Sequence, residues 1–130
     1  MRQRANALII RDKKILLIRE RGYWYTPGGG IEDGESPSQA IARECDEEIG
    51  VTVLAVRPYF VYDSINIISN TPQRNHCFFV DIEGEPRACT LVDEIEEIRW
   101  VDREGLSVLP DIIPYEQEMI FDRLADEGLV

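Results

Sequence analysis

Short apolar runs separated by polar or turn-forming residues mark the first third of the chain. Ala5–Arg11 and Lys14–Glu20 are isoleucine- and leucine-rich, and only Asp12-Lys13 separates them. This pattern predicts a β-hairpin. After the aromatic residues Tyr23-Trp24-Tyr25 comes Pro27-Gly28-Gly29-Gly30. We expect this glycine run to interrupt regular structure and to let the backbone approach a ligand closely.

The clearest helix signal follows the glycine run. Ser36 is a preferred N-cap residue, and Gln39 completes a Ser-x-x-Gln capping box. Proline suits the first helical position, and Gly50 is typical of a helix C-terminus. These signals predict a helix over Pro37–Ile49.

The second half of the chain alternates between strand-like and polar segments. Strands are predicted at Val51–Tyr62, His76–Ile82 and Ile95–Val101, with Pro58 indicating an edge or a bulge and Ser64–Asn75 a loop.

Pro110 and Pro114 bracket the start of a last predicted helix, which runs to about Glu127. Its apolar face comprises Ile113, Ile120, Phe121 and Leu124. Strands with one helix in mid-chain and one at the end predict an α/β fold, in which helices cover both faces of a mixed sheet.

Length and composition narrow the class of protein. The 130 residues, 44% hydrophobic and 30% charged, suit one globular domain over residues 1–130. No apolar run approaches the roughly 20 residues that a membrane helix needs, and the N-terminus lacks a signal-peptide cleavage pattern. Cys45, Cys77 and Cys89 are odd in number and widely spaced, which favours buried thiols in a reducing cytoplasm.

The net charge of −11 excludes some partners and suggests a cofactor. So acidic a surface repels nucleic acid polymers and anionic membranes. A small phosphorylated substrate therefore needs a cation between itself and the protein, which indicates a metal ion.

The predicted helix over residues 37–49 has two unlike faces. One face is built to pack and carries Ile41, Ala42, Cys45 and Ile49. The other face is charged and carries Arg43, Glu44, Glu47 and, at its edge, Glu48, together with Ala40. Glu44 and Glu48 repel each other at i,i+4 spacing. Two interpretations follow: a solvated acidic face, or an oxygen-ligand site at which Mg²⁺ removes the repulsion. The nearby glycine run favours the second.

These residues fit a known pattern. From Gly29 the chain reads Gly29-x5-Glu35-x7-Arg43-Glu44-Cys45-x-Glu47-Glu48-x-Gly50-Val51. This resembles the Nudix box at every charged and glycine position. The one departure is Cys45, where the family usually has a bulkier aliphatic residue.

The resemblance implies an α/β/α sandwich and Mg²⁺- or Mn²⁺-assisted attack of water on a diphosphate linkage. By position, Glu44, Glu47 and Glu48 are expected to bind the metal, with Glu44 and Glu47 central to catalysis. Arg43 is expected to orient these glutamates, and Glu35 to assist from the loop. Family members are often dimers, so a homodimer is a further expectation.

Outside the box, the acidic residues before Trp100 have two interpretations. Relatives often place another metal ligand here, and Glu94 is our candidate, although Glu94, Glu96 and Glu97 each also suit the surface. The single histidine, His76, begins an apolar strand, so we favour a structural role over that of a general base.

The candidate substrate-binding residues lie near the glycine run. Gly28, Gly29 and Gly30 are expected to admit the substrate. Arg19 and Arg21 are candidates for holding phosphates, or else surface ion pairs. Trp24 is a candidate for stacking on a nucleobase, or else a core residue.

The resulting hypothesis is a Mg²⁺-dependent hydrolase of a nucleoside diphosphate-linked substrate, with normal or damaged nucleoside triphosphates favoured. Subfamilies that act on ADP-ribose or dinucleoside polyphosphates resemble one another in a Pro or Tyr beyond the box, and Asn66–Ser69 contains neither. The alternatives are hydrolysis of ADP-ribose, NDP-sugars or dinucleoside polyphosphates, and a non-catalytic nucleotide-binding regulator. The intact box glutamates argue against the regulator.

Overall fold

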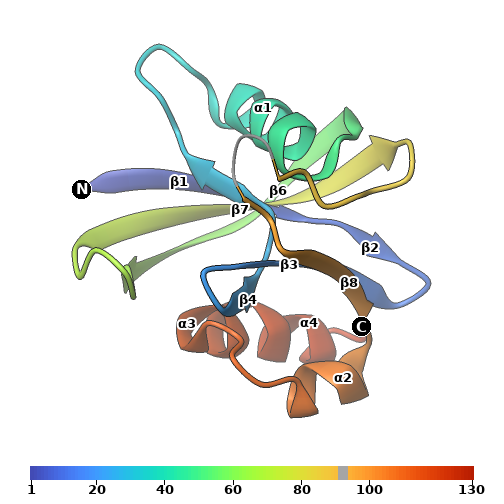
Figure 1. Cartoon of the computed structure of the whole chain (residues 1–130). Coiled ribbons are helices and arrows are strands. Elements are labelled where there is room, and N and C mark those ends of the chain that lie inside the picture. Colours follow the sequence, from blue (N-terminus) through green and yellow to red (C-terminus); the bar gives the residue numbers. More distant parts are fainter. Residues whose placement is uncertain (91–93) are drawn as a thin grey trace.

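The computed structural model, which describes residues 1–90 and 94–130, has helices on both sides of its strands. In Figure 1, α1 (Pro37–Ile49) lies over one side, and the helices of the C-terminal part lie on the other. This is the α/β/α sandwich predicted from the sequence. Among the described residues, no helix combines the length and apolarity needed to cross a membrane.

The first sheet is mixed. Its order is β5 (Gly28–Gly30), β1 (Arg2–Leu8), β7 (Pro72–Glu83) and β6 (Thr52–Ile65). β1 and β7 are parallel, whereas the β1–β5 and β6–β7 pairs are antiparallel. The predicted mixed sheet is therefore confirmed.

The second sheet contains β2 (Ile10–Arg11), β3 (Lys14–Glu20), β4 (Tyr23–Tyr25) and β8 (Glu97–Val101), which pairs with β3. The predicted hairpin is confirmed between β2 and β3. Asp12 and Lys13 both have positive φ, 52° and 60°, as a tight two-residue hairpin turn requires. The first apolar run differs from the prediction, because it starts at Arg2 and divides near Ile9 between the two sheets.

β3 is buried on both faces and so joins two cores. Leu16 and Ile18 pack toward α1, whereas Ile15 and Leu17 pack with the C-terminal helices. Alternation along a strand sends successive side chains to opposite faces. A strand covered on both faces needs a continuous apolar run, and the run in β3 fulfils this requirement.

Helix α1 confirms the predicted boundaries and caps. The Gln39 N–H donates to Ser36 Oγ at 3.1 Å, and the Ser36 N–H donates to the Gln39 side chain at 2.8 Å. Gly50 ends the helix at φ 66°. One detail was wrong: Ala40 is buried and Ala42 is exposed. The buried arc is centred on Ile41 and Glu48 instead of Cys45.

The predicted loop Ser64–Asn75 is confirmed for residues 66–71 but was too long at both ends, because β6 extends to Ile65 and β7 starts at Pro72. The polar residues Gln73 and Asn75 are buried, and their side-chain amides donate to Ser64 Oγ at 3.1 Å and to the Tyr62 carbonyl at 3.2 Å. Polar residues with such partners fit inside a sheet. The ladder register shifts between Pro58 and Phe60, which confirms the predicted bulge.

The C-terminal part contains α2 (Arg103–Val108), which was not predicted, and then three consecutive helical segments. These are α3 (Pro114–Glu116), the π-helical turn η1 (Gln117–Phe121) and α4 (Asp122–Asp126). Together they form one uninterrupted helical segment, which confirms the helix predicted to reach about Glu127, with a π-helical turn that was not predicted. The predicted apolar residues Ile113, Ile120, Phe121 and Leu124 are all buried.

Candidate active site

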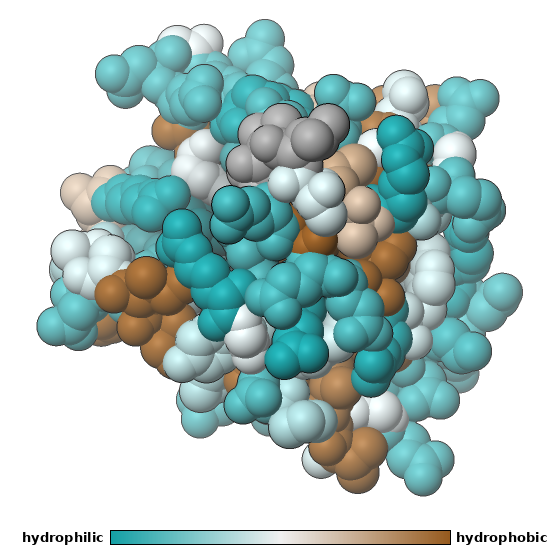
Figure 2. Space-filling model, in the orientation of Figure 1, coloured by the Kyte–Doolittle hydropathy of each residue, from teal (hydrophilic) through white to brown (hydrophobic). Residues whose placement is uncertain are grey.

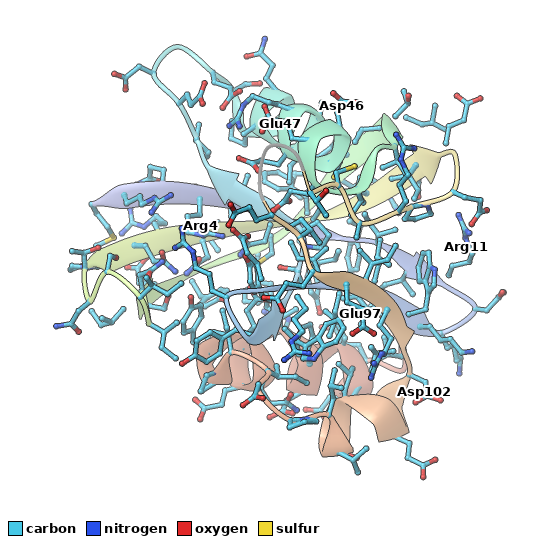
Figure 3. The ribbon with its side chains drawn as sticks, in the orientation of Figure 1. Arg4, Arg11, Asp46, Glu47, Glu97 and Asp102 are labelled. Atoms are coloured by element: carbon cyan, nitrogen blue, oxygen red, sulfur yellow. The ribbon has the colours of Figure 1, made fainter. Side chains whose placement is uncertain are left out.

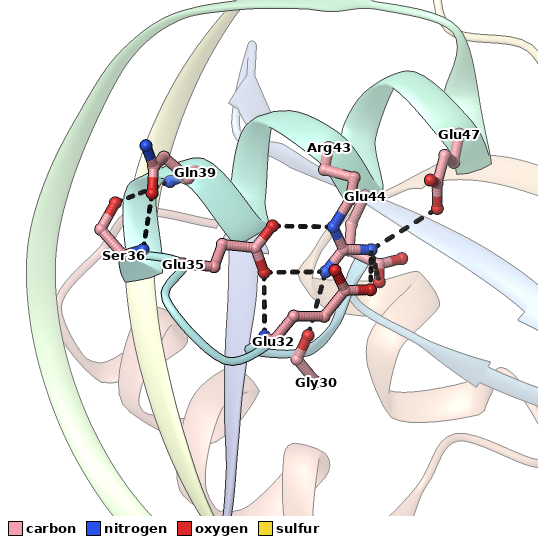
Figure 4. A network of polar contacts seen from close by, with 8 residues as sticks. All are labelled: Gly30, Glu32, Glu35, Ser36, Gln39, Arg43, Glu44 and Glu47. Carbon is pink, nitrogen blue, oxygen red and sulfur yellow. Dashed lines mark hydrogen bonds and ion pairs between the residues drawn. The ribbon is translucent and has the colours of Figure 1, made fainter.

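Arg43 is the centre of a polar network on α1 (Figure 4). Its Nε and Nη2 donate to the two carboxylate oxygens of Glu35 at 2.8 and 3.0 Å. Nη1 donates to Glu44 Oε1 at 2.8 Å, and Nη2 also donates to the Gly30 carbonyl at 3.1 Å. Such a bidentate pair fixes the guanidinium plane. Arg43 therefore ties the loop before α1 to the acidic face of the helix and to β5.

The network carries excess negative charge. Arg43 Nη1 also lies 3.6 Å from Glu47 Oε2 and 3.8 Å from Glu32 Oε1, so one cation faces several carboxylates. The hydrogen bond from Arg43, followed by that from the Glu32 N–H, lowers the pKa of Glu35 to about 2. The same pairing with Glu35 raises the pKa of Arg43. Both groups are therefore charged throughout the physiological range.

Glu48 and Glu44 face the glycine strand. Glu48 is 2% exposed, and its Oε1 accepts a 2.8 Å hydrogen bond from the Gly28 N–H. A Cβ built on Gly29 would lie 2.5 Å from Glu44 Oε1. β5 can approach α1 this closely only because Gly29 has no side chain. The prediction that the glycine run would interrupt regular structure was wrong, because the run forms strand β5. Its backbone does approach another group closely, and that group is the Glu44 side chain of α1.

The donor chemistry of Glu44, Glu47 and Glu48 suits a metal ion. Carboxylate oxygens are the preferred ligands of hard cations such as Mg²⁺, and the excess negative charge around Arg43 favours a cation. Within the described part of the chain, however, no three His, Cys, Asp or Glu side chains are grouped closely enough to hold an ion. The fit therefore rests on donor type and charge.

A pocket of about 260 Å³ lies beside this network. Its wall includes Glu44 and Glu48 of α1 and all three glycines of β5. The other lining residues come from β1, the end of β3, the β3–β4 turn, β4, the β6–β7 loop and the segment that enters α3. The face shown in Figure 2 is mostly hydrophilic, with hydrophobic side chains in separate patches. The pocket thus joins the box helix to segments distant in sequence.

The structure separates the predicted substrate-binding residues. Gly28, Gly29, Gly30 and Arg21 line the pocket, but Arg19 and Trp24 do not. Arg19 Nε lies 3.8 Å from Glu96 Oε2, in the ion pair that was the alternative interpretation.

Trp24 is 3% exposed within the core on the side of the C-terminal helices. Strand alternation explains this placement, because it sends Tyr23 and Tyr25 toward the pocket and Trp24 away from it.

Glu94 is exposed, has φ 53° and does not line the pocket. Its metal-binding role stays a prediction. Glu96 pairs with Arg19, and Glu97 pairs with Arg99 at 2.7 Å. His76 Nε2 lies 2.6 Å from Gln3 Oε1, outside the pocket, which agrees with a structural role.

Sequence reasoning missed several pocket residues, among them Arg2, Arg4, Tyr115 and Glu116. They lie far from the box in sequence, and the pairing of β1 with β5 and the position of α3 bring them to it. One signal was available for the arginines. Residues two apart on a strand share a face, and Arg2 and Arg4 would point together if the first strand began early enough.

Glu116 is a buried carboxyl at the pocket wall. It is 3% exposed, and its Oε1 accepts a 2.8 Å hydrogen bond from the Thr26 N–H. Burial raises its pKa to about 7, and the hydrogen bond only partly offsets this rise.

We expect Glu116→Gln to alter the pH dependence of stability. The raised pKa means that the folded chain binds a proton more tightly than the unfolded chain. The resulting stabilisation is complete below about pH 4.5 and is lost as pH rises through about 7. Glutamine keeps an acceptor for Thr26 without the charge, so the variant should gain up to about 3 kcal/mol over the parent at pH 8. Denaturant unfolding at pH 5 and 8 measures this, and an equal difference at both pH values would contradict it.

Gly28 and Gly29 are expected to respond differently to alanine. At Gly28 the φ is +144° and a Cβ would lie 2.1 Å from the Ala5 carbonyl oxygen, so Gly28→Ala should cost more than about 2 kcal/mol of stability. At Gly29 the Cβ would meet only the Glu44 carboxylate. Gly29→Ala should therefore keep most stability but lose at least about tenfold in turnover. Thermal unfolding measures the stability of both variants, and steady-state kinetics measure their turnover. An unfolded Gly29→Ala together with a stable Gly28→Ala would contradict these expectations.

Comparisons with known proteins agree with this fold and site. The sequence model of the NUDIX domain matches residues 1–122. The chain is 33% identical over 95 residues to the nucleoside triphosphatase NudI of Enterobacter sp. (strain 638), covering 68% of this chain and 67% of the relative. It is 32% identical to the uncharacterized Nudix hydrolase YvcI of Bacillus subtilis, covering 96% and 80%. The crystal structure of a MutT NUDIX hydrolase from Burkholderia pseudomallei superposes with a TM-score of 0.78 at 27% identity, covering 95% and 97%.

An α/β/α sandwich with a capped acidic helix beside a glycine strand is the arrangement of a Nudix hydrolase. The chain belongs to the Nudix family.

Proposed function

We propose that the chain is a Mg²⁺-dependent pyrophosphohydrolase that cleaves a phosphoanhydride bond in a nucleotide, with nucleoside triphosphates as favoured substrates. The observation that carries this proposal is the network in which Arg43 bonds Glu35 and Glu44 at 2.8 Å beside a pocket of about 260 Å³. The name of the NudI relative, a nucleoside triphosphatase, supports the substrate class.

The residues of the Nudix box have different roles in this proposal. Glu44, Glu47 and Glu48 would hold the metal, with Glu94 as a further candidate ligand and Mn²⁺ as a substitute for Mg²⁺. When bound, such an ion neutralises phosphate oxygens and lowers the pKa of a bound water. Arg43 orients Glu44, and Glu35 orients Arg43. These hydrogen bonds pre-position the carboxylates, so little reorganisation is needed during the reaction.

The glycine strand contributes shape and a hydrogen bond. The Gly28 N–H donates to Glu48 Oε1 and holds this carboxylate in place. Because Gly29 and Gly30 present no side chains to the pocket, a phosphate chain can approach the carboxylates closely. The three cysteines are free. Cys45 and Cys77 are buried as predicted, whereas Cys89 is only half-buried. Free thiols suit a reducing cytoplasm, where we place the protein.

A nucleotide panel tests the proposal. Purified protein with Mg²⁺ would be incubated with nucleoside triphosphates, ADP-ribose, an NDP-sugar and a dinucleoside polyphosphate, and products separated by ion-exchange chromatography. We expect a nucleoside monophosphate and pyrophosphate from at least one triphosphate. Faster cleavage of ADP-ribose, the NDP-sugar or the dinucleoside polyphosphate would show that the favoured substrate is not a nucleoside triphosphate. Binding without cleavage of any compound would favour the regulator.

A further inference from the structure

The arginines of this chain divide into two groups. Seven have a carboxylate oxygen within 4.0 Å: Arg11, Arg19, Arg43, Arg57, Arg74, Arg99 and Arg123. Among residues 1–90 and 94–130, the other five form no such pair: Arg2, Arg4, Arg21, Arg87 and Arg103. In a chain with 25 acidic and 14 basic residues, an arginine that finds no carboxylate needs an explanation.

Two of these five contact other parts of the fold. Arg103 donates to the backbone carbonyls of Ala125 and Val130. The Arg87 guanidinium lies beside Gly50, at the C-terminal end of α1, where a helix attracts positive charge. The remaining three, Arg2, Arg4 and Arg21, all line the pocket beside the box helix.

The three arginines reach the pocket from two sides. Arg2 and Arg4 lie two residues apart on β1, and Arg4 pairs in register with Gly30. The Arg2 guanidinium lies 3.0 Å from the position that a Cβ on Gly30 would take. Arg21 belongs to the β3–β4 turn, where it has φ 54°. Figure 3 shows Arg4 on the side of β1 that faces β4. Arg2 and Arg4 therefore lie next to the glycine strand that borders the acidic helix, and Arg21 lines the same pocket from the turn.

The carboxylates of the same pocket bond to other donors. Glu20 accepts from the Tyr25 hydroxyl, Glu44 from Arg43, Glu48 from the Gly28 N–H and Glu116 from the Thr26 N–H. The charge of Arg4 limits the rise in the pKa of Glu116. Its guanidinium nevertheless forms no ion pair with that carboxylate, so charge compensation within the pocket does not account for all three arginines. Guanidinium groups without a carboxylate partner are suited to bind phosphate oxygens.

We propose that Arg2, Arg4 and Arg21 bind the phosphate chain of the substrate and select a terminal triphosphate over a diphosphate bridged between two organic groups. This rests on the proposed function and specifies its substrate. A nucleoside triphosphate carries about four negative charges at neutral pH and a bridged diphosphate about two. One divalent cation at the box neutralises the bridged diphosphate completely. It leaves negative charge on the triphosphate, and the arginines neutralise this remaining charge.

The test measures binding without turnover. Arg2→Met, Arg4→Met and Arg21→Met keep much of the side-chain volume and remove the charge. Arg57→Met is the control, since Arg57 pairs with Asp81 outside the pocket. Titration calorimetry with Mg²⁺ would use two probes, inorganic tripolyphosphate and ADP-ribose. Thermal unfolding would verify that each variant is folded, and Arg4→Lys would show whether charge alone restores binding should Arg4→Met unfold.

We expect each pocket variant to weaken tripolyphosphate binding by about tenfold or more, as the loss of charge-assisted hydrogen bonds implies, and to change ADP-ribose binding less than about threefold. Arg57→Met should bind like the parent. No measurable tripolyphosphate binding by the parent, unchanged binding in the variants, or equal losses for both probes would overturn the proposal. Because neither readout needs hydrolysis, a catalytically inactive protein that still binds tripolyphosphate through these arginines would refute only the proposed function.

Discussion

Arg43→Lys is expected to lower kcat by about two orders of magnitude while the chain still folds. Lysine keeps one positive charge beside Glu35, Glu44 and Glu47, so the net charge of the network does not change. It cannot reproduce the bidentate bond to Glu35 together with the bonds to Glu44 and the Gly30 carbonyl. The carboxylate of Glu44 would lose its fixed position, and small displacements of reacting groups are costly in rate.

Arg74→Lys is the matched control for this change. Arg74 also makes a bidentate pair, with Asp63 at 2.9 and 3.2 Å, but it is exposed and lies outside the pocket. Its replacement should leave steady-state kinetics unchanged, because exposed ion pairs contribute little. Equal kinetics for Arg43→Lys and the parent would show that the guanidinium geometry has no part in turnover.

The second large effect is expected at Glu47. Glu47→Gln removes one anionic ligand and should lower turnover by about two orders of magnitude or more. Stability without metal should change by only tenths of a kcal/mol, because the contact to Arg43 is 3.6 Å long and the side chain is 31% exposed. The stabilisation that Mg²⁺ adds to the parent should shrink, since that increment depends on affinity for the folded chain.

Asp46→Asn supplies the control on the same helix. Asp46 precedes Glu47, is exposed and does not line the pocket, so this change removes one charge with the same near-isosteric chemistry (Figure 3). Kinetics and Mg²⁺-dependent thermal shifts should match the parent. Loss of both activity and metal-free stability in Glu47→Gln would identify Glu47 as structural, and equal activity in the two variants would remove it from the site.

The features predicted well from the sequence are local. The limits of α1 follow from Ser36, Gln39 and Gly50, whose effects act within a few residues. The acidic face followed from helical periodicity, although Glu48 turned inward to meet the Gly28 N–H. That inward turn was not predictable, since its partner comes from a strand.

Features that depend on strand pairing were missed. The glycine run forms β5 because its backbone groups pair with β1, and glycine has little preference for a strand by itself. Gln73 and Asn75 are polar yet buried, because neighbouring side chains satisfy them. The arginines on β1 join the pocket beside the box helix only because β1 lies beside β5. Sequence separation hides such neighbours, whereas the box itself is contiguous.

The most direct measurement is hydrolysis of a nucleoside triphosphate followed by ³¹P NMR, first in EDTA and then after Mg²⁺ is added in excess. We expect no turnover in the chelator. With Mg²⁺ we expect release of nucleoside monophosphate and pyrophosphate by the parent, and release slower by about two orders of magnitude or more by Glu47→Gln. Mn²⁺ should also restore activity. Full turnover in EDTA, or none with either metal for any nucleotide of the panel, would contradict a metal-dependent phosphoanhydride hydrolase built on Arg43 and its glutamates.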